Sequence, residues 1–357
     1  MKIVKKTLKV LLILVLLAVL ALGGLVGWLS AVEYRPASVE AVKPLRTEAA
    51  GKLGSGAELK LLCWNIGYAG LGAGSDFVMD GGQNMRAADR ATVRQYLAGI
   101  AGTLEQGDYD LALLQEVDVN SSRTYGTDEA EALAFGDAAF ALNYSCPFVP
   151  NPSTYLIDPM GKVNSGLLSC SRFTVARSER HALPCPFSWP LRIVNLKRCL
   201  LVDYLPIEGS DKQLVLVNLH LEAYDDGEGR LAQTRQLMDF LAREYEKGNY
   251  VIAGGDFNQL FPGALETYPN THQENWDPLG LEESSLPEGF SFAYDLAAPS
   301  CRLLNQPYDP SDTVNTQYYV IDGLIVSPNV TVRSVRTLDL GFADSDHNPV
   351  ELSVTLG

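Results

Sequence analysis

The sequence predicts a layered α/β domain with large β-sheets, preceded by one membrane-spanning helix. From Glu58 to the end of the chain, short apolar segments alternate with amphipathic helices. An uncharged apolar run stands near the N-terminus. Many strands and few helices are typical of packed layers that include a large sheet.

The N-terminal segment has the pattern of a membrane anchor. Four lysines precede Val10–Leu29, a run of twenty residues without charge. A helix of this length spans roughly 30 Å, the thickness of the hydrocarbon core of a bilayer. Because positive flanks stay in the cytoplasm, we predict a single-pass signal anchor over residues 1–29 with the rest of the chain outside the cytoplasm.

A cleaved signal peptide is the alternative. Ala21-Leu22-Gly23 has the small-x-small pattern of a cleavage site. The apolar run nevertheless continues to Leu29, which is longer than the apolar part of an ordinary signal peptide. The length of the run favours the anchor.

The remaining chain divides into a linker and one domain. Residues 30–57 show no sustained periodicity and end in Gly and Ser, so we expect a spacer that lifts the domain from the membrane. Helical spacing of apolar residues predicts helices at about 86–104 and around 231–241. Apolar runs predict strands at 59–66, 111–114, 166–169, 199–204, 214–221, 251–254, 319–327 and 349–354.

The charge of the domain is strongly negative. The whole chain carries −15, and without the four N-terminal lysines the remaining 24 basic and 43 acidic residues give −19 for residues 10–357. An anionic surface repels a polyanion such as duplex DNA, and the sequence has no long Lys/Arg run to offset this. Arg172, Lys197 and Arg198 are local basic groups that could serve one phosphate group.

The six cysteines contain no CxxC pair, so a zinc ribbon or a thioredoxin-like site is not supported. Cys63, Cys170 and Cys199 lie in apolar runs and are expected to be buried. Cys146 and Cys185 are candidates for a disulfide, which the sequence alone cannot pair.

Several polar residues interrupt otherwise apolar strands. A polar group in such a place costs several kcal/mol if it has no partner, and strand ends converge on one rim of a sheet. Taken singly, each residue could be structural. The set is Asn65 in LLCWNIG, Glu116 in LALLQEV, His220 in LVLVNLHL, Asp256 and Asn258 in VIAGGDFN, Asp322 in YVIDGLIVS and His347 in SDHNPV.

The order of these motifs, with NSGLLSCSR between the second and third, resembles the endonuclease/exonuclease/phosphatase superfamily, which has the deoxyribonuclease-like fold. The resemblance covers residues 58–357 and extends to membrane-anchored bacterial members with an MDGG-containing loop, here residues 67–82. It implies a four-layer sandwich of two packed mixed β-sheets flanked by helices, with the active site at one end.

The resemblance also implies roles for the residues that match the motifs. Glu116 with Asn65 beside it, and Asp346 as a further candidate, would bind a divalent cation, usually Mg²⁺, with Mn²⁺ as an alternative. Asp256 would activate the attacking water, and Asp322 would orient and charge His347. His220 and Asn258 would hold the phosphoryl oxygens, with Asn164 near the scissile group.

These roles predict a metal-dependent phosphoesterase that cleaves a small phosphoester or a phospholipid head group. A nuclease acting on DNA or RNA is one alternative. The other is a surface binding module of the same fold that has lost catalysis, but such a protein should lack one of the site residues, and all of them are present.

Overall fold

Two seven-stranded sheets pack face to face in the computed structural model, which describes residues 2–152, 154, 157–225 and 227–357. Sheet A has the strand order β1 (Val39–Val42), β7 (Arg177–Ala182), β8 (Cys199–Pro206), β9 (Gln213–His220), β10 (Tyr250–Asp256), β14 (Asp322–Val326) and β11 (Ser291–Ala293). Sheet B has the order β15 (Val330–Thr337), β16 (Val350–Leu356), β3 (Glu58–Asn65), β4 (Leu111–Asp118), β6 (Gly161–Ser171), β5 (Asp137–Val149) and β2 (Pro44–Thr47).

Helices and short elements complete the chain. A two-stranded sheet joins β12 (Cys301–Arg302) and β13 (Tyr318–Tyr319). The α-helices are α1 (Lys2–Ala31), α2 (Arg90–Gly107), α3 (Glu129–Leu133), α4 (Glu228–Glu246) and α5 (Ala264–Thr267). The 3₁₀ turns are η1 (Gly67–Ala69), η2 (Val78–Asp80), η3 (Leu191–Val194) and η4 (Glu283–Ser285).

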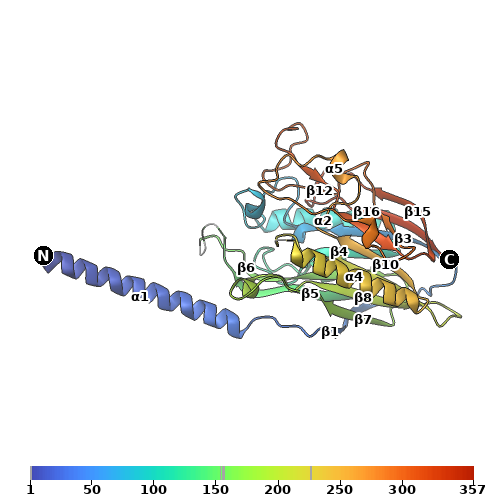
Figure 1. Cartoon of the computed structure of the whole chain (residues 1–357), viewed down its shortest axis with the longest axis horizontal. Coiled ribbons are helices and arrows are strands. Elements are labelled where there is room, and N and C mark those ends of the chain that lie inside the picture. The colour runs from blue at the N-terminus through green and yellow to red at the C-terminus, as the bar shows by residue number, and fades with distance from the viewer. Residues whose placement is uncertain (1, 153, 155–156, 226) are drawn as a thin grey trace.

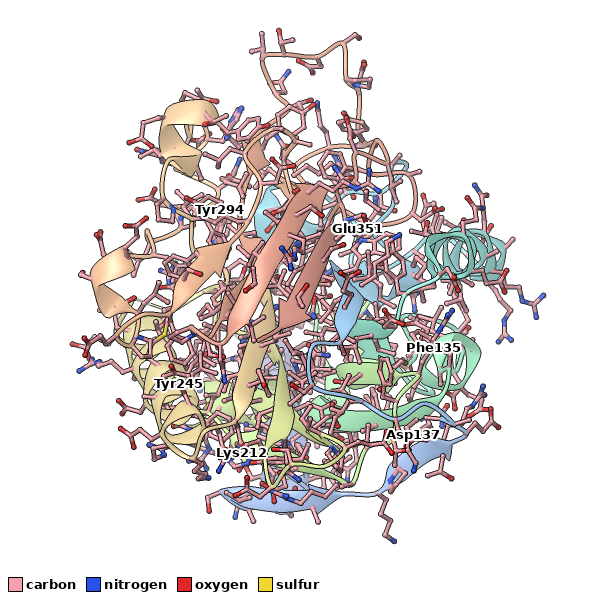
Figure 2. All side chains as sticks on the ribbon, turned by 90° about the vertical axis from the view of Figure 1, so that its right-hand side faces the viewer. Phe135, Asp137, Lys212, Tyr245, Tyr294 and Glu351 are labelled. Atoms are coloured by element: carbon pink, nitrogen blue, oxygen red, sulfur yellow. The ribbon has the colours of Figure 1, made fainter. Side chains whose placement is uncertain are left out.

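The packing confirms the predicted four layers. Leucine and isoleucine side chains from both sheets, such as Leu61 and Ile252, form the core between them. Each such burial stabilises the fold by about 1.5–3 kcal/mol. Apolar residues of α2, such as Ile100, cover the outer face of sheet B. Leu237 and Leu241 of α4 cover the outer face of sheet A. Figure 1 shows these layers, and Figure 2 views them from the end opposite α1.

Both long helices of the domain connect parallel neighbouring strands. Helix α2 joins β3 to β4, and α4 joins β9 to β10. The Asp89 side chain accepts a hydrogen bond from the Thr92 amide (2.8 Å), which fixes the start of α2 a few residues after the predicted position. Because strands joined in this way run in the same direction, their carboxyl ends meet at one end of the molecule.

Helix α1 is long and apolar enough to cross a membrane. The helix Ile3–Ala31 contains a stretch of 18 residues with a mean hydropathy of 3.0, and the domain buries none of that stretch. Figure 1 shows the helix projecting away from the packed sheets.

The segment expected as a spacer differs from that expectation. Within residues 30–57, β1 pairs with β7 at the edge of sheet A and β2 pairs with β5 at the edge of sheet B. Edge strands are short and partly exposed, so they lack the apolar run by which inner strands are predicted. The segment is therefore part of the folded domain and not a free linker.

The six cysteines are all free. Cys63, Cys170 and Cys199 are buried as expected. Of the two disulfide candidates, the Cys146 thiol donates to the Phe148 carbonyl (3.3 Å) and the Cys185 thiol contacts the Leu196 carbonyl (3.9 Å).

A buried carboxyl group on β8 gives a test of the packing. Burial raises the pKa of Asp203 to about 6, against the hydrogen bond from Ser178. Since its folded pKa lies above the unfolded value, the ionised group destabilises the fold as pH rises through that range. We expect Asp203→Asn to raise the free energy of unfolding at pH 7.5 by about 2 kcal/mol, and the gain to vanish below pH ~4. Thermal unfolding across this pH range measures it.

Asp211→Asn is the matched control, because Asp211 is exposed in the adjacent turn. It should shift stability by less than about 0.5 kcal/mol at either pH. An Asp203→Asn gain that is the same at pH 4 and pH 7.5 would contradict the assigned ionisation.

Candidate active site

Three polar side chains form one row across sheet A. The strand register places His220 of β9 and Asp322 of β14 directly beside Asp256 of β10. Alternation along the strands directs them to the inner face, the same face on which Leu216 and Ile252 enter the core between the sheets. The row therefore marks the end of the inter-sheet core.

Asp256 is the central member of this row. Its Oδ2 lies 3.4 Å from His220 Nε2 and 3.8 Å from His347 Nε2, and all three side chains are buried. Burial and the nearby Asp322 carboxylate raise the pKa of Asp256 to about 7, while His347 opposes the rise. The group is thus poised to exchange a proton near neutral pH.

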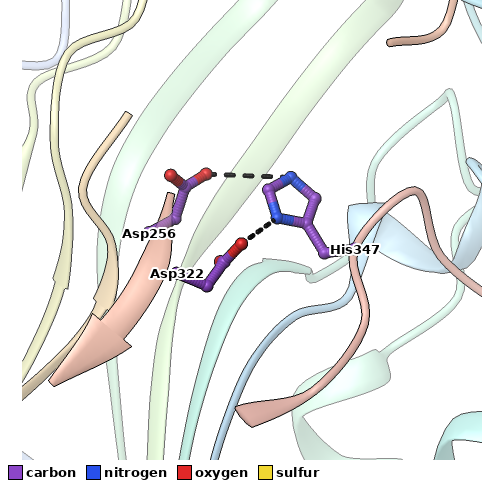
Figure 3. Close-up of side chains that lie close together, drawn as sticks. All are labelled: Asp256, Asp322 and His347. Atoms are coloured by element: carbon purple, nitrogen blue, oxygen red, sulfur yellow. Dashed lines mark hydrogen bonds and ion pairs between the residues drawn. The ribbon is translucent and has the colours of Figure 1, made fainter. Parts of the chain in front are cut away.

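His347 and Asp322 form a hydrogen-bonded pair. His347 Nδ1 lies 2.8 Å from Asp322 Oδ2, as Figure 3 shows. Burial alone would lower the pKa of His347, but the Asp322 carboxylate, together with Cys301 and Asp346, outweighs burial and holds that pKa well above its usual value. The imidazole is therefore cationic at neutral pH.

Ser300 holds the Asp322 carboxylate in place. Its hydroxyl donates to Asp322 Oδ2 (2.8 Å) and accepts from the backbone amides of Ile321 and Asp322, both at 3.0 Å. Sequence reasoning missed this residue, because Ser300 lies in a loop without a distinctive motif.

His220 has the opposite protonation preference. Burial, Arg198 and His347 all lower its pKa well below the usual value, so the ring is neutral. Among the residues that the structure describes, none forms a hydrogen bond with its Nδ1. A buried ring nitrogen without a protein partner is available to a ligand.

Sheet B contributes Asn65 and Glu116 from the opposite side. Asn65 ends β3, and its Nδ2 donates both to Glu116 Oε1 (3.3 Å) and to Asp256 Oδ2 (3.0 Å). Its Oδ1 accepts from the Gly67 amide (3.0 Å). Asn65 thus forms a hydrogen-bonded link between the two sheets at this end.

A β-bulge sets the direction of Glu116. The register of β4 against β6 shifts between Leu114 and Val117, and Glu116 has a φ of 55°. Its neighbour Gln115 faces the inter-sheet core, where Nε2 donates to Asn218 Oδ1 (2.8 Å). In a regular strand Glu116 would point to the opposite face, so the bulge brings it beside Asn65.

Asp346 closes the site beside His347. Its Oδ2 lies 3.9 Å from His347 Nε2. Burial raises the pKa of Asp346 to about 7, with Glu116 adding to the rise and His347 opposing it. At Gly67, which has a φ of 51°, a Cβ atom would stand 2.7 Å from Asp346 Oδ1, so only glycine fits this turn.

The donor chemistry of Asn65, Glu116 and Asp346 fits a hard divalent cation. Carboxylate and amide oxygens are the ligands that Mg²⁺ prefers. The raised pKa of Asp346 reflects buried, mutually repelling carboxylates that a cation would relieve. Among the His, Cys, Asp and Glu side chains that the structure describes, Asp256, Asp322 and His347 are the group whose potential ligand atoms lie within 4.8 Å of one another.

Two predicted substrate residues have other partners in the structure. Asn258, with a φ of 49°, donates from Nδ2 to the Leu221 carbonyl (2.9 Å) and from its backbone amide to Asp256 Oδ1 (2.8 Å). Asn164 lies on β6 at the same end of sheet B, and its Oδ1 accepts from the Ser145 hydroxyl (2.9 Å). Asn258 therefore adjoins the row across sheet A, whereas the Asn164 side chain bonds away from it.

The loop of residues 67–82 covers one side of the site. Asp80 accepts a hydrogen bond from the hydroxyl of Tyr224 (2.9 Å). Tyr224 lies four residues after His220 in the sequence. Burial raises the pKa of Asp80, and the nearby Glu116 adds to it. The contact between Asp80 and Tyr224 was not predictable from the sequence, because it joins the short turn η2 to a segment 144 residues further along the chain.

The local basic groups expected to meet a phosphate are paired with acidic residues. Arg172 forms an ion pair with Asp108 at the other end of β6. The Arg198 Nε donates to Glu222 Oε2 (3.2 Å), and the Lys197 ammonium lies 3.4 Å from Glu33 Oε1. These three residues do not form a free cationic patch beside the row across sheet A.

Comparisons with known proteins agree with this architecture. The model of the Endonuclease/Exonuclease/phosphatase family matches residues 62–347. The crystal structure of an endonuclease/exonuclease/phosphatase from Beutenbergia cavernae has a TM-score of 0.54 at 18% identity, covering 84% of this chain and 72% of that chain. A family protein from Bacteroides thetaiotaomicron has a TM-score of 0.51 at 15% identity, covering 85% of this chain and 99% of that chain.

A family protein from Leptotrichia buccalis also has a TM-score of 0.51 at 15% identity, covering 83% of this chain and 99% of that chain. At these identities the solved structures show the shared fold alone. The comparison with curated proteins gives no match.

Proposed function

The chain belongs to the endonuclease/exonuclease/phosphatase family, and from that premise we propose that it hydrolyses phosphoester bonds with the help of a divalent cation. The observation that carries the proposal is the buried row of His220, Asp256 and Asp322 with His347 against it. A cationic imidazole, a neutral imidazole and a carboxyl group with a pKa near 7 are together suited to activate water and to stabilise a charged phosphoryl group.

Asn65, Glu116 and Asp346 would hold the cation, Mg²⁺ or Mn²⁺. When bound, the cation would neutralise negative charge that develops on the phosphoryl oxygens. The Asn65 Nδ2 group donates to the carboxylates of Glu116 and Asp256 and so holds both of them at the site.

In the proposed reaction, Asp256 accepts a proton from water as the water oxygen forms a bond to phosphorus. The bond from phosphorus to the leaving oxygen breaks, and that oxygen leaves with the electron pair and takes a proton from solvent. His347, charged by Asp322, stabilises the crowded phosphoryl group, and His220 and Asn258 hold its oxygens.

The substrate is expected to be a small phosphoester or a phospholipid head group. Residues 10–357 carry −19, and Arg172, Lys197 and Arg198 pair with acidic residues. Tight binding to duplex DNA engages several phosphates at once, which needs a cationic surface.

We therefore expect kcat/KM on inositol phosphates or phospholipid vesicles to exceed kcat/KM on plasmid DNA by about tenfold at equal Mg²⁺ and low salt. The reason is that long-range repulsion slows the association of the anionic domain with a polyanion. The measurement uses the full chain in detergent with all three substrates. Plasmid nicking as the fastest reaction would instead make the protein a nuclease. Inertness towards all three with Mg²⁺ or Mn²⁺ would favour a binding module.

We also propose that α1 anchors the protein, with the N-terminal lysines in the cytoplasm and the domain outside. Protease added to intact cells should digest the domain, and the protein should stay in the membrane pellet after a carbonate wash, because a spanning helix is held by its apolar surface. A soluble mature form beginning near Gly24 would show that the segment is a cleaved signal peptide.

A further inference from the structure

The last turns of α1 pack directly into the domain. Leu29 is only 5% exposed, and it clusters with Met85, Tyr144 and Ile193. Leu25 and Val26 pack partly against the same cluster. From Leu25 to Ser30 the helix rises about 7 Å, so the domain contacts one side of the helix within the end of its apolar segment, while Trp28 on the same turns stays exposed.

Polar contacts fasten the same junction. The Trp189 indole donates to the Ser30 hydroxyl (3.1 Å), and Arg192 Nε donates to Glu33 Oε1 (2.9 Å). Burial favours the neutral form of Glu33, yet the bonds from Arg192 and Arg35 lower its pKa to about 2. Packing and ion pairing together fix the direction in which the domain leaves the helix.

The junction and the active site lie at the same end of the molecule. The cluster around Leu29 includes Val163, at the beginning of β6. Because β6 runs antiparallel to β4, Ser165 pairs with Asp118, two residues beyond Glu116. Figure 2 looks at the other end, where Lys212 precedes β9. The catalytic residues therefore face the side from which α1 projects in Figure 1.

Exposed apolar side chains stand beside the exit of the helix. Trp189 is 59% exposed although its indole nitrogen bonds to Ser30, and Leu191, two residues later, is 61% exposed. Ile157, in the loop before β6, is also exposed. Large apolar groups on a surface mark contact sites, and tryptophan favours the head-group level of a bilayer.

We propose that this end of the domain rests on the leaflet from which α1 emerges, with Trp189 and Leu191 inserted at the head-group level. In this orientation the catalytic residues receive the phosphoester of a phospholipid head group from that leaflet. The occupant follows from continuity with α1: any bilayer that holds Val10–Leu29 brings its head groups to Ser30 and thus to Trp189. This inference rests on the proposed function and names its substrate class.

The orientation is tested without reference to activity. The full chain with Trp28→Phe is reconstituted in phosphatidylcholine vesicles that contain brominated lipid, a quencher of tryptophan fluorescence in contact with the acyl region. Trp64 is buried and Trp276 packs on Tyr319, so the quenched signal should come from Trp189. We expect clear quenching that disappears when Trp189→Phe is added. Equal quenching with and without Trp189 would overturn the orientation.

The substrate class is tested by a ratio of activities. The double variant Trp189→Gln, Leu191→Gln should lower hydrolysis of phospholipid in vesicles about tenfold, because two inserted side chains are lost. It should change hydrolysis of soluble bis(p-nitrophenyl) phosphate less than about twofold, because the catalytic residues are retained. Leu265→Gln is the matched control, since Leu265 is 51% exposed on α5, away from α1 in Figure 1.

The outcomes separate the two proposals. A vesicle activity that stays unchanged, or falls in parallel with the soluble activity, overturns the lipid assignment while the phosphoesterase proposal stands. Quenching of Trp189 in a protein that cleaves neither substrate supports the orientation and rejects the proposed function.

Discussion

Glu116→Gln should lower kcat at saturating substrate by at least about a hundredfold. The substitution keeps the size of the side chain and its hydrogen bond with Asn65, but it removes the charge that would hold the divalent cation. Loss of one electrostatic stabiliser of a phosphoryl transition state has an effect of this order. Turnover measured over a Mg²⁺ titration should also show the midpoint shifted to higher Mg²⁺.

Glu282→Gln is the control, because Glu282 is exposed in a loop and the change in charge is the same. It should leave both kcat and the Mg²⁺ midpoint unchanged within about twofold. Full turnover of the native protein after treatment with EDTA, or a fully active Glu116→Gln variant, would reject the cation mechanism.

The sequence predicted the layers of the fold because inner strands and covering helices carry strong apolar patterns. Every second residue of β9 points to the same face, and on this face lie Leu214, Leu216, Asn218 and His220. A correct strand assignment therefore already places His220 beside the core. The parallel pairing of β9 with β10 then sets His220 next to Asp256. Local periodicity and chain direction are enough for this part of the site.

Other features depend on contacts between distant segments. The bulge that directs Glu116 is a local change of register, and one residue more or less in a strand leaves no clear pattern in a single sequence. Ser300 is defined only by its place beside Asp322, which lies in another segment of the chain. The edge strands β1 and β2 are stabilised by partners far along the chain, so residues 30–57 resemble a linker when considered alone.

The pairing of charged residues also depends on contacts between distant segments. Net charge can be counted from the sequence, but the pairing of Arg172 with Asp108 and of Arg198 with Glu222 requires the fold. The direct packing of α1 on the domain likewise required the structure, because Leu29 belongs to the apolar run that predicts the membrane span. The same residue contributes to both the span and the domain core.

His347→Ala should lower kcat by about a thousandfold, since the cationic imidazole is expected to stabilise the phosphoryl group. Asp322→Asn should lower kcat by about a hundredfold, since Asp322 acts only by charging and orienting the imidazole. If so, the double variant should be no slower than His347→Ala alone, because removing the imidazole leaves Asp322 without a catalytic task. Single-turnover rates at saturating Mg²⁺ measure the chemical step for all four proteins.

The pair of His272 and Glu274, whose Nδ1 and Oε1 atoms lie 3.3 Å apart in the loop after α5, is the matched control. His272→Ala, Glu274→Gln and their combination should each change the rate less than twofold. Multiplying losses in the Asp322 and His347 variants would show two independent contributions and would reject the paired mechanism. The imidazole is 2.8 Å from one carboxylate and 3.8 Å or more from Asp256 and Asp346, so the pairing with Asp322 is the interaction whose removal the coupling should report.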